Sequence, residues 1–504
     1  MKPWDAILTA ARPVGERFAA AMADPGAAQR ALLQDIVKAN AASEFGRAQG
    51  FAGISSYEAY AARIPIRTYA DHAADIARMA NGERGVLTTD PVIAFEETGG
   101  TSQGAKLIPY TARSLSGFRD AVLPWLADLA RRRPAVMAGE VYASISPATR
   151  AAKMTASGLP IGLLSDAAYL GEDLVPAFME LLAISPTLGG IAEVDQWRLE
   201  TLVQLVANPR LSLISVWSPT FLTSLLPHIG AMADAIAARV DAEARGRLDA
   251  ALAGGDLNLS RLWPMLDTIS CWTDGVSAQF IPALHQMVPH AYIDAKGLLA
   301  TEAAITTRLG AAPGAVPALL SCVTEYVGQD GIPRLCDTLS EGEAYEVVIT
   351  TYGGLYRYAM GDVVRCVSIA QGCPRLIFEG RAGVHSDMVG EKLDDAFVAG
   401  ALAPLSRPAA LVPRLNPYPH YALWVEAQGD TLPPLDQLAG QVEAALCANP
   451  HYAYARKIGQ LGAIDVGVRT DLVGLIIKKG LASGARLGDT KAVGLLINVE
   501  GECA

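Results

Sequence analysis

Residues 92–111 read VIAFEETGGTSQGAKLIPYT, and the function of the chain is best approached from this stretch. A short apolar run leads into a loop that is dense in glycine and hydroxyl side chains and that a lysine closes. Glycines let backbone N–H groups approach an anion closely, hydroxyls add donors, and the lysine adds a positive charge. The candidates for holding a polyphosphate are Thr98, Gly99, Gly100, Thr101, Ser102, Gly104 and Lys106.

This loop is not a Walker A phosphate loop. That pattern requires Gly-Lys followed directly by Ser or Thr, whereas Ala105 precedes Lys106 and Leu107 follows it. Taken alone, the segment could equally be an ordinary surface loop, because Gly, Ser and Thr are common in loops. The choice between the two depends on the rest of the chain.

Composition narrows the class of protein. The chain has 504 residues, of which 51% are hydrophobic, and its net charge is −11. That length allows two to four domains with large cores, and the acidic balance argues against a nucleic-acid partner. No apolar run reaches the length of about 18 residues that predicts a membrane span. Seven cysteines without a CxxC pair predict a reduced cytoplasmic protein.

Alanine-rich helices alternate with short apolar runs of strand type, which predicts an α/β architecture with mixed or parallel sheets. Helices are expected over 199–207 and 228–253. Strands are expected over 141–146, 211–217, 266–272, 318–323, 345–351 and 363–369. We expect a large N-terminal domain, residues 1–382, with a β-rich subdomain near 340–380. A small mobile α+β domain, residues 383–504, would follow.

Three further segments carry polar residues between predicted strands. Glu302, at the end of an expected strand over 290–302, could hold Mg²⁺ through its oxygens, or it could be a solvated residue at a helix start. Asp362, after Gly361, could accept hydrogen bonds from both ribose hydroxyls, or it could cap its own turn. Lys491, taken alone, is typical of a solvated surface charge.

In this order the four segments resemble the Gretchen Hagen family of acyl-acid amido synthetases, within the firefly-luciferase-type adenylate-forming superfamily. Residues 98–106 match the superfamily's phosphate loop in length and in most of its key positions. Residues 356–364 (YRYAMGDVV) are close to the family's ribose-binding motif, and residues 262–264 and 273–282 (TDGVSAQFIP) are also similar. The resemblance covers nearly the whole chain, and the alanine-rich composition suggests a bacterial member.

The resemblance implies specific roles for these residues. Residues 98–106 would cradle the phosphates of ATP, Gly275 and Thr301 would lie at the nucleotide, and Glu302 would hold Mg²⁺. Asp362 would bind the ribose and Arg381 would touch it at a hinge, while Lys106 and Lys491 would be the catalytic lysines. Two positions depart from the pattern: Leu298 stands where a tyrosine usually stacks on adenine, and Ala492 where plant members often have proline.

The function implied is an ATP-dependent ligase. It would adenylate a small carboxylic acid, release pyrophosphate, and pass the acyl group to an amine such as an amino acid. Two alternatives remain open: transfer to a thiol of coenzyme A or a carrier protein, and a non-catalytic nucleotide-binding protein. Trp217 and Phe221 could line the acyl pocket, although core packing explains them equally well.

Overall fold

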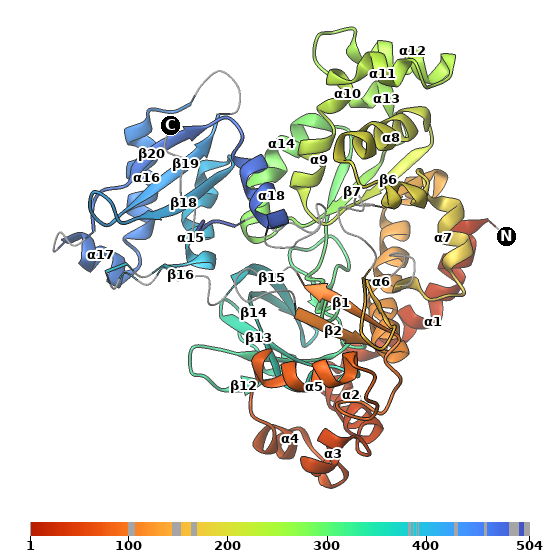
Figure 1. Ribbon diagram of the computed structural model, residues 1–504, viewed down its shortest axis with the longest axis vertical. Coiled ribbons are helices and arrows are strands. Elements are labelled where there is room, and N and C mark those ends of the chain that lie inside the picture. The colour runs from red at the N-terminus through yellow and green to blue at the C-terminus, as the bar shows by residue number, and fades with distance from the viewer. Residues whose placement is uncertain are drawn as a thin grey trace.

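The computed structural model describes residues 2–98, 106–143, 153–162, 169–381, 385–386, 388–389, 391, 393–427, 432–457, 461–482 and 493–497. Figure 1 shows three groups of elements: a helix-rich group around β6 and β7, a β-rich group around β13–β15, and a C-terminal group around β18–β20. The N-terminus lies beside α1 and α7, on the side of the molecule opposite the C-terminal group.

A parallel sheet forms the centre of the helix-rich group. Its strands are β3 (Glu140–Ala143), β6 (Leu211–Ser215), β7 (Thr268–Cys271) and β8 (Tyr292–Ala295), in that order and all parallel. Ile214 and Ile269 on the central strands are fully buried, as expected for strands covered by helices on both faces. The predicted strands over 211–217 and 266–272 are therefore confirmed.

Helices flank this sheet. On one side α1 (Pro3–Ala23) packs against α6 (Ala112–Arg132) and α7 (Val175–Leu181). The remaining helices of this group are α8 (Val194–Ala207), α9 (Pro219–Leu225), α10 (His228–Ala231), α11 (Ala233–Ala237), α12 (Ala242–Leu252), α13 (Leu259–Leu262) and α14 (Ile281–Met287). Their core includes the fully buried indoles of Trp197 and Trp263.

A second, smaller sheet contains the segment that opened the sequence analysis. Strands β1 (Ala94–Thr98) and β2 (Lys106–Tyr110) pair antiparallel, with Thr98 opposite Lys106. Strands β5 (Pro160–Ile161) and β4 (Lys153–Met154) complete the sheet in the order β2-β1-β5-β4. The residues between the paired strands, 99–105, lie outside the described part of the chain.

The expected β-rich region is confirmed as an antiparallel sheet in the order β12-β11-β13-β14-β15. Its strands are β11 (Val323–Val327), β12 (Pro333–Arg334), β13 (Ala344–Thr350), β14 (Tyr358–Ala370) and β15 (Cys373–Arg381). Short strands β9 (Thr306–Thr307) and β10 (Val316–Pro317) precede it. Helices α2 (Pro25–Ala39), α3 (Glu44–Ala48), α4 (Tyr57–Arg63) and α5 (Ala70–Ala80) lie beside this group (Figure 1).

The C-terminal group has a sheet and a core of its own. The sheet order is β18-β19-β20, from β18 (Ala409–Arg414), β19 (His420–Glu426) and β20 (Asp465–Arg469). The other elements are β16 (His385–Ser386), β17 (Leu393–Asp394), α15 (Asp395–Leu402), α16 (Leu435–Leu446), α17 (Pro450–Lys457) and α18 (Leu472–Ala482). The boundary expected after residue 382 falls among residues 382–384, outside the described part, and stays a prediction.

Three expectations of secondary structure were wrong. The predicted helix over 228–253 is three helices, α10 to α12, because Asp241 is extended and its side chain accepts a hydrogen bond from Ala244 N at 2.8 Å, which starts a new helix. The strand expected over 318–323 is a buried turn at residues 318–322, and β11 begins only at Val323. A short apolar run does not by itself distinguish a strand from another buried segment. Strand β8 ends at Ala295, so Thr301 and Glu302 lie in the segment that follows it.

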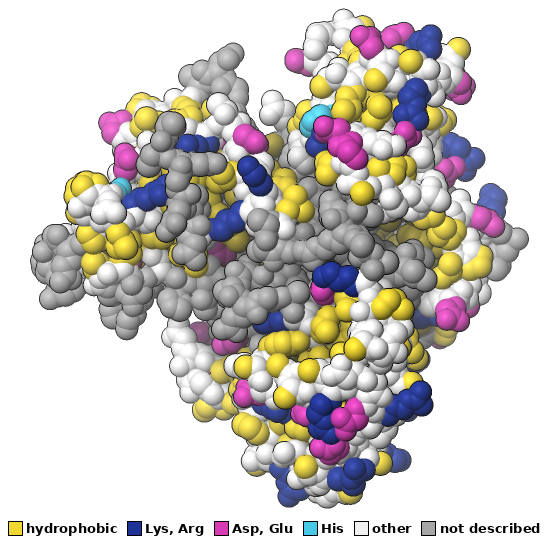
Figure 2. All heavy atoms as spheres, viewed as in Figure 1, with side chains coloured by type: hydrophobic (Ala, Val, Ile, Leu, Met, Phe, Trp, Pro, Cys, Tyr) yellow, Lys and Arg dark blue, Asp and Glu magenta, His cyan; other side chains and the backbone are white. Residues whose placement is uncertain are grey.

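The described surface carries mixed charge. On the face in Figure 2, Lys and Arg side chains lie among Asp and Glu side chains over all three groups. No helix in the described ranges combines the length and apolarity that crossing a bilayer needs. Six cysteines in those ranges are free thiols, of which Cys447 alone is exposed.

Candidate active site

Lys106 stands at the start of β2, where the hairpin register places it beside Thr98. Its Nζ lies 5.4 Å from the ring centroid of Tyr69, which comes from the residue before α5. The Tyr69 hydroxyl donates to the carbonyl of Leu107 at 3.2 Å and accepts from Leu107 N at 2.8 Å. The predicted loop residues Gly99, Gly100, Thr101, Ser102 and Gly104 lie outside the described residues.

Thr301 and Glu302 face the same region from the segment after β8. The Tyr110 hydroxyl donates to the Thr301 carbonyl at 2.7 Å, which ties this segment to β2. Glu302 is 9% exposed and forms no hydrogen bond or ion pair within the described part of the chain. Burial raises the pKa of Tyr69 and of Tyr358, and the nearby Glu302 charge raises both further. Tyrosines from two other segments therefore lie close to this carboxylate.

Asp362 and Arg381 form an ion pair between neighbouring strands. They are direct partners in the β14–β15 register, and Arg381 Nε donates to Asp362 Oδ1 at 2.8 Å. The Asp362 carboxylate raises the pKa of the Arg381 guanidinium above its usual value. Asp362 is fully buried, whereas the Arg381 side chain is 35% exposed. In this arrangement solvent reaches the pair through Arg381.

Gly275 brings the loop after β7 against the same strand. Its φ is +56°, in the left-handed region that favours glycine. A Cβ at this position would lie 3.1 Å from the carbonyl oxygen of Glu379, two residues before Arg381. Asp274 Oδ2 accepts a hydrogen bond from Phe378 N at 3.4 Å and helps to hold this approach. The structure thus brings Gly275 and Arg381 to neighbouring positions.

Of the two positions that depart from the superfamily pattern, the structure describes Leu298 but not Ala492. Leu298 is 8% exposed and packs in the large core cluster, where its N–H donates to Thr306 Oγ1 at 2.7 Å. Lys491 and Ala492 lie outside the described residues. The segment after them is described: Gly494 N and Leu495 N donate to Asp395 Oδ1 at 2.9 and 2.8 Å.

An apolar cavity of about 130 Å³ lies between α6, the parallel sheet and residues of the segment after β8. Its walls come from α6, from the ends of β3 and β6, and from residues 296–299 after β8. Apolar lining residues include Val122, Leu126, Val141, Phe178, Leu213 and Leu299. Of the two aromatic candidates, Trp217 lines the cavity, whereas Phe221 packs in the core beside Trp197.

The sequence matches two models of one family. The GH3 family N-terminal domain matches residues 14–244, and the GH3 family central domain matches residues 329–381. Together these matches span more than half of the chain. The chain belongs to the GH3 family.

The named relatives of this GH3 chain are plant amido synthetases. A putative indole-3-acetic acid-amido synthetase, GH3.10 of Oryza sativa subsp. japonica, is 25% identical over 77% of this chain and 84% of its own length. A probable indole-3-acetic acid-amido synthetase, GH3.1 of the same organism, is 24% identical over 93% of this chain and 87% of its own length. Both relatives are thus ligases by name, and both cover most of the length of this chain.

Solved structures confirm the GH3 fold. The GH3.15 acyl acid amido synthetase superposes with a TM-score of 0.80 at 18% identity, over 94% of this chain and 91% of the other. A 2-hydroxyisobutyryl-CoA ligase in the postadenylation state superposes with a TM-score of 0.56 at 14% identity, over 93% and 89%. The predicted α/β fold with mixed and parallel sheets is therefore confirmed.

The structure of the GH3 chain contains a buried ion pair, Arg357–Glu325, that the sequence analysis did not predict. Arg357 lies in the segment 356–364 that resembles the ribose-binding motif. Its Nε donates to both carboxylate oxygens of Glu325 at 3.1 and 3.0 Å. Its Nη1 donates to the carbonyls of Ala61 and Ile64 at 2.8 and 2.6 Å, and its Nη2 donates to Glu325 Oε1 at 2.9 Å. Both charged side chains are nearly inaccessible. The two residues are 32 positions apart in the sequence, so no local pattern predicted that they would pair. In the structure Arg357 also has a positive φ of +48°.

Proposed function

We propose that this protein joins a carboxylic acid to an amine at the expense of ATP. In the first step a carboxylate oxygen attacks the α-phosphorus of ATP, and the bond to pyrophosphate breaks. In the second step the amine nitrogen attacks the acyl carbon of the acyl-adenylate; AMP leaves with the bonding electron pair, and the amine loses a proton. The names of the relatives favour an amine as the acceptor, because an amido synthetase forms an amide; the family resemblance implies an amino acid as that amine.

The first step needs charge stabilisation more than bond-making groups, because phosphoryl chemistry is mainly positioning and electrostatics. Lys106 and the loop over 98–106 would hold the phosphates. Asp362 would bind the ribose and its ion-pair partner Arg381 would touch it, with Gly275 and Thr301 beside the nucleotide. Support comes from the neighbours that these residues share: the Glu302 charge acts on Arg381, the register partner of Asp362, and on Tyr69, whose ring centroid lies 5.4 Å from Lys106 Nζ.

We assign the Mg²⁺ expected with ATP to Glu302. A buried carboxylate that has no partner in the described part of the chain suits a hard cation that keeps phosphate and water oxygens as its other ligands. No group of three His, Cys, Asp or Glu side chains that could hold a metal by themselves occurs in the described ranges. Bound there, the ion would neutralise phosphate charge.

The apolar cavity, which is lined by residues that shortly precede Glu302 in the chain, is the observation that carries the proposal. Gly297 and Leu299 line it, and Thr301 and Glu302 follow them in the chain. Tyr169, also on its wall, lies 3.4 Å from the Tyr110 hydroxyl, which holds the Thr301 carbonyl. An apolar acid in the cavity could thus present its carboxylate toward the phosphate residues.

The C-terminal group would complete the site. We propose residues 1–382 and 383–504 as two domains, with Lys491 presented by the second for the adenylation step. Contacts between the groups support a docked arrangement: Gln279 Oε1 accepts from Ala409 N at 2.8 Å. A rotation about the region near Arg381 would then admit the amine.

The decisive test is ATP–pyrophosphate exchange with Mg²⁺ and a panel of apolar carboxylic acids. Exchange that needs one class of acid would support adenylation, and its loss in Lys106→Ala and Lys491→Ala would support the assigned lysines. Amino acids and coenzyme A are then added separately; AMP release with amino acids supports amide formation. Absence of exchange with every acid, by a protein that still binds ATP, would contradict the proposal.

A further inference from the structure

Lys296 projects its charge into the apolar cavity. It follows β8 directly, and its Nζ lies 4.9 Å from the ring centroid of Trp217 and 5.3 Å from that of Trp125. The same Nζ donates to Ser215 Oγ at 2.8 Å. Lys296, Ser215 and both indoles line the cavity. One wall of an apolar space therefore presents an ammonium held between two aromatic faces.

An ammonium in such a place has a chemical consequence. Removing a charge from water is unfavourable, so buried ammonium groups interact with aromatic faces or with oxygen atoms. A lysine carries three donors, and a ligand oxygen within reach of Nζ would accept a hydrogen bond from a charged donor. A purely hydrocarbon ligand offers no such acceptor and gains none of this stabilisation.

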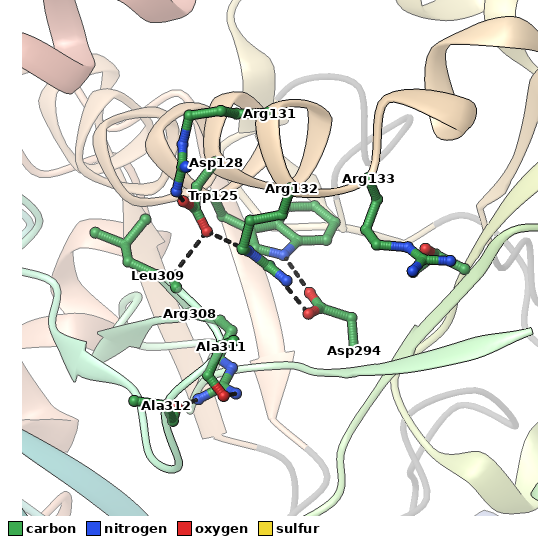
Figure 3. A network of polar contacts seen from close by, with 12 residues as sticks. Trp125, Asp128, Arg131, Arg132, Arg133, Asp294, Arg308, Leu309, Ala311 and Ala312 are labelled. Carbon is green, nitrogen blue, oxygen red and sulfur yellow. Dashed lines mark hydrogen bonds and ion pairs between the residues drawn. The ribbon is translucent and has the colours of Figure 1, made fainter.

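The indole of Trp125 is fixed from behind by a polar network, which Figure 3 shows. Its Nε1 donates to Asp294 Oδ2 at 3.1 Å, and Asp294 is fully buried. Arg132 Nη2 donates to the other Asp294 oxygen, Oδ1, at 3.0 Å, and Arg132 Nε donates to Asp128 Oδ2 at 2.7 Å. Asp128 in turn accepts from Gly310 N at 2.7 Å. Helix α6, strand β8 and the segment after β9 thus hold this wall of the cavity in place.

We propose that Lys296 makes the enzyme select acids with a second oxygen acceptor, a hydroxyl, carbonyl or carboxylate, on the apolar part of the molecule. The inference rests on the proposed function, because it assigns the acyl group of that reaction to this cavity. Asp294 and Trp125 act as positioning residues that keep the ammonium directed into the cavity. Lys296 is then a specificity-determining residue for the acid.

Binding of matched acids tests the proposal without requiring turnover. The probes are 3-phenylpropanoic acid against 3-(4-hydroxyphenyl)propanoic acid, and hexanoic acid against 6-hydroxyhexanoic acid, measured by isothermal titration calorimetry. A hydrogen bond to a charged donor corresponds to about tenfold or more in affinity. We expect the wild type to prefer at least one hydroxy acid by that factor and Lys296→Met to lose the preference while it binds the plain acid as before.

Controls separate the possible failures. Lys38→Met removes an exposed lysine on α2 and should leave the preference unchanged. Lys296→Gln keeps a neutral donor and should show an intermediate preference; it also serves if Lys296→Met does not fold. Equal losses for both members of a pair, or a preference that survives both variants, would overturn the inference. Selective binding without any pyrophosphate exchange would instead contradict the proposed function.

Discussion

Replacing Arg357 by methionine should strongly destabilise the protein. Arg357 occupies a left-handed backbone position, φ +48°, which costs a non-glycine residue about 1–2 kcal/mol. Its hydrogen bonds to Glu325, Ala61 and Ile64 offset that cost. Through these bonds Arg357 joins β11 and the end of α4 to the residue before β14, the strand that carries Asp362.

The magnitude follows from what the substitution leaves behind. Arg357→Met leaves the Glu325 carboxylate, 1% exposed, without its cation, and breaking a buried pair costs about 3–5 kcal/mol. Two buried carbonyls also lose their donors. Because typical stabilities are about 5–15 kcal/mol, we expect a loss of at least about 4 kcal/mol. The double variant Arg357→Met/Glu325→Met removes both charges, and it should recover about 2 kcal/mol relative to Arg357→Met.

Urea unfolding followed by circular dichroism measures both quantities. The single variant should unfold at a much lower urea concentration than the wild type, and the double variant should lie between them. The Tyr57 hydroxyl, which donates to Glu325 at 2.9 Å, and the two carbonyls stay unpaired in the double variant, so recovery should be incomplete. A loss below about 1 kcal/mol, or additive losses in the double variant, would refute this reasoning.

Three further predictions concern other parts of the site. Glu302→Gln should raise the Mg²⁺ concentration for half-maximal pyrophosphate exchange about tenfold or more; an unchanged Mg²⁺ dependence would remove Glu302 from the metal site. Burial raises the pKa of Asp395 to about 6 from 3.8, so its protonated form stabilises the fold fully below about pH 4. That contribution, up to about 3 kcal/mol, is lost as the pH rises through about 6. The unfolding free energy of Asp395→Asn, measured from pH 4 to 7, should lack this slope, and an identical slope in both proteins would contradict the assignment. Gly380→Ala should lower the urea midpoint, because the new Cβ would lie 2.7 Å from Ala396 Cα, at a cost of about 1–3 kcal/mol; an unchanged midpoint would show that α15 moves freely.

The strands and the order of motifs could be predicted from the sequence because both depend on local pattern. Most residues of the runs over 211–217 and 266–272 are apolar, and mostly apolar runs are typical of buried parallel strands. The helix over 228–253 failed because a single cap at Asp241 outweighed a long apolar period. Alanine favours a helix without specifying where it begins or ends.

The site was predictable only where one residue carries the chemistry. Lys106, Asp362 and Arg381 belong to recognisable motifs, and the structure brings Asp362 and Arg381 into contact. The sequence did not single out Lys296 as a site residue, because a lysine at the end of a strand is a common feature. Its meaning comes from Trp125 and Trp217, which are distant in sequence and reach the cavity only through α6 and β6.

The tryptophans give the cavity a built-in optical reporter. Trp4, Trp125 and Trp217 are three of the seven tryptophans, and all three line the cavity. Two of them face the Lys296 ammonium, so a ligand that displaces water or shares that charge would change their emission. Trp197 and Trp263 are sealed in a separate core and would contribute a constant background. Acids could therefore be screened by intrinsic fluorescence, without a label and without ATP.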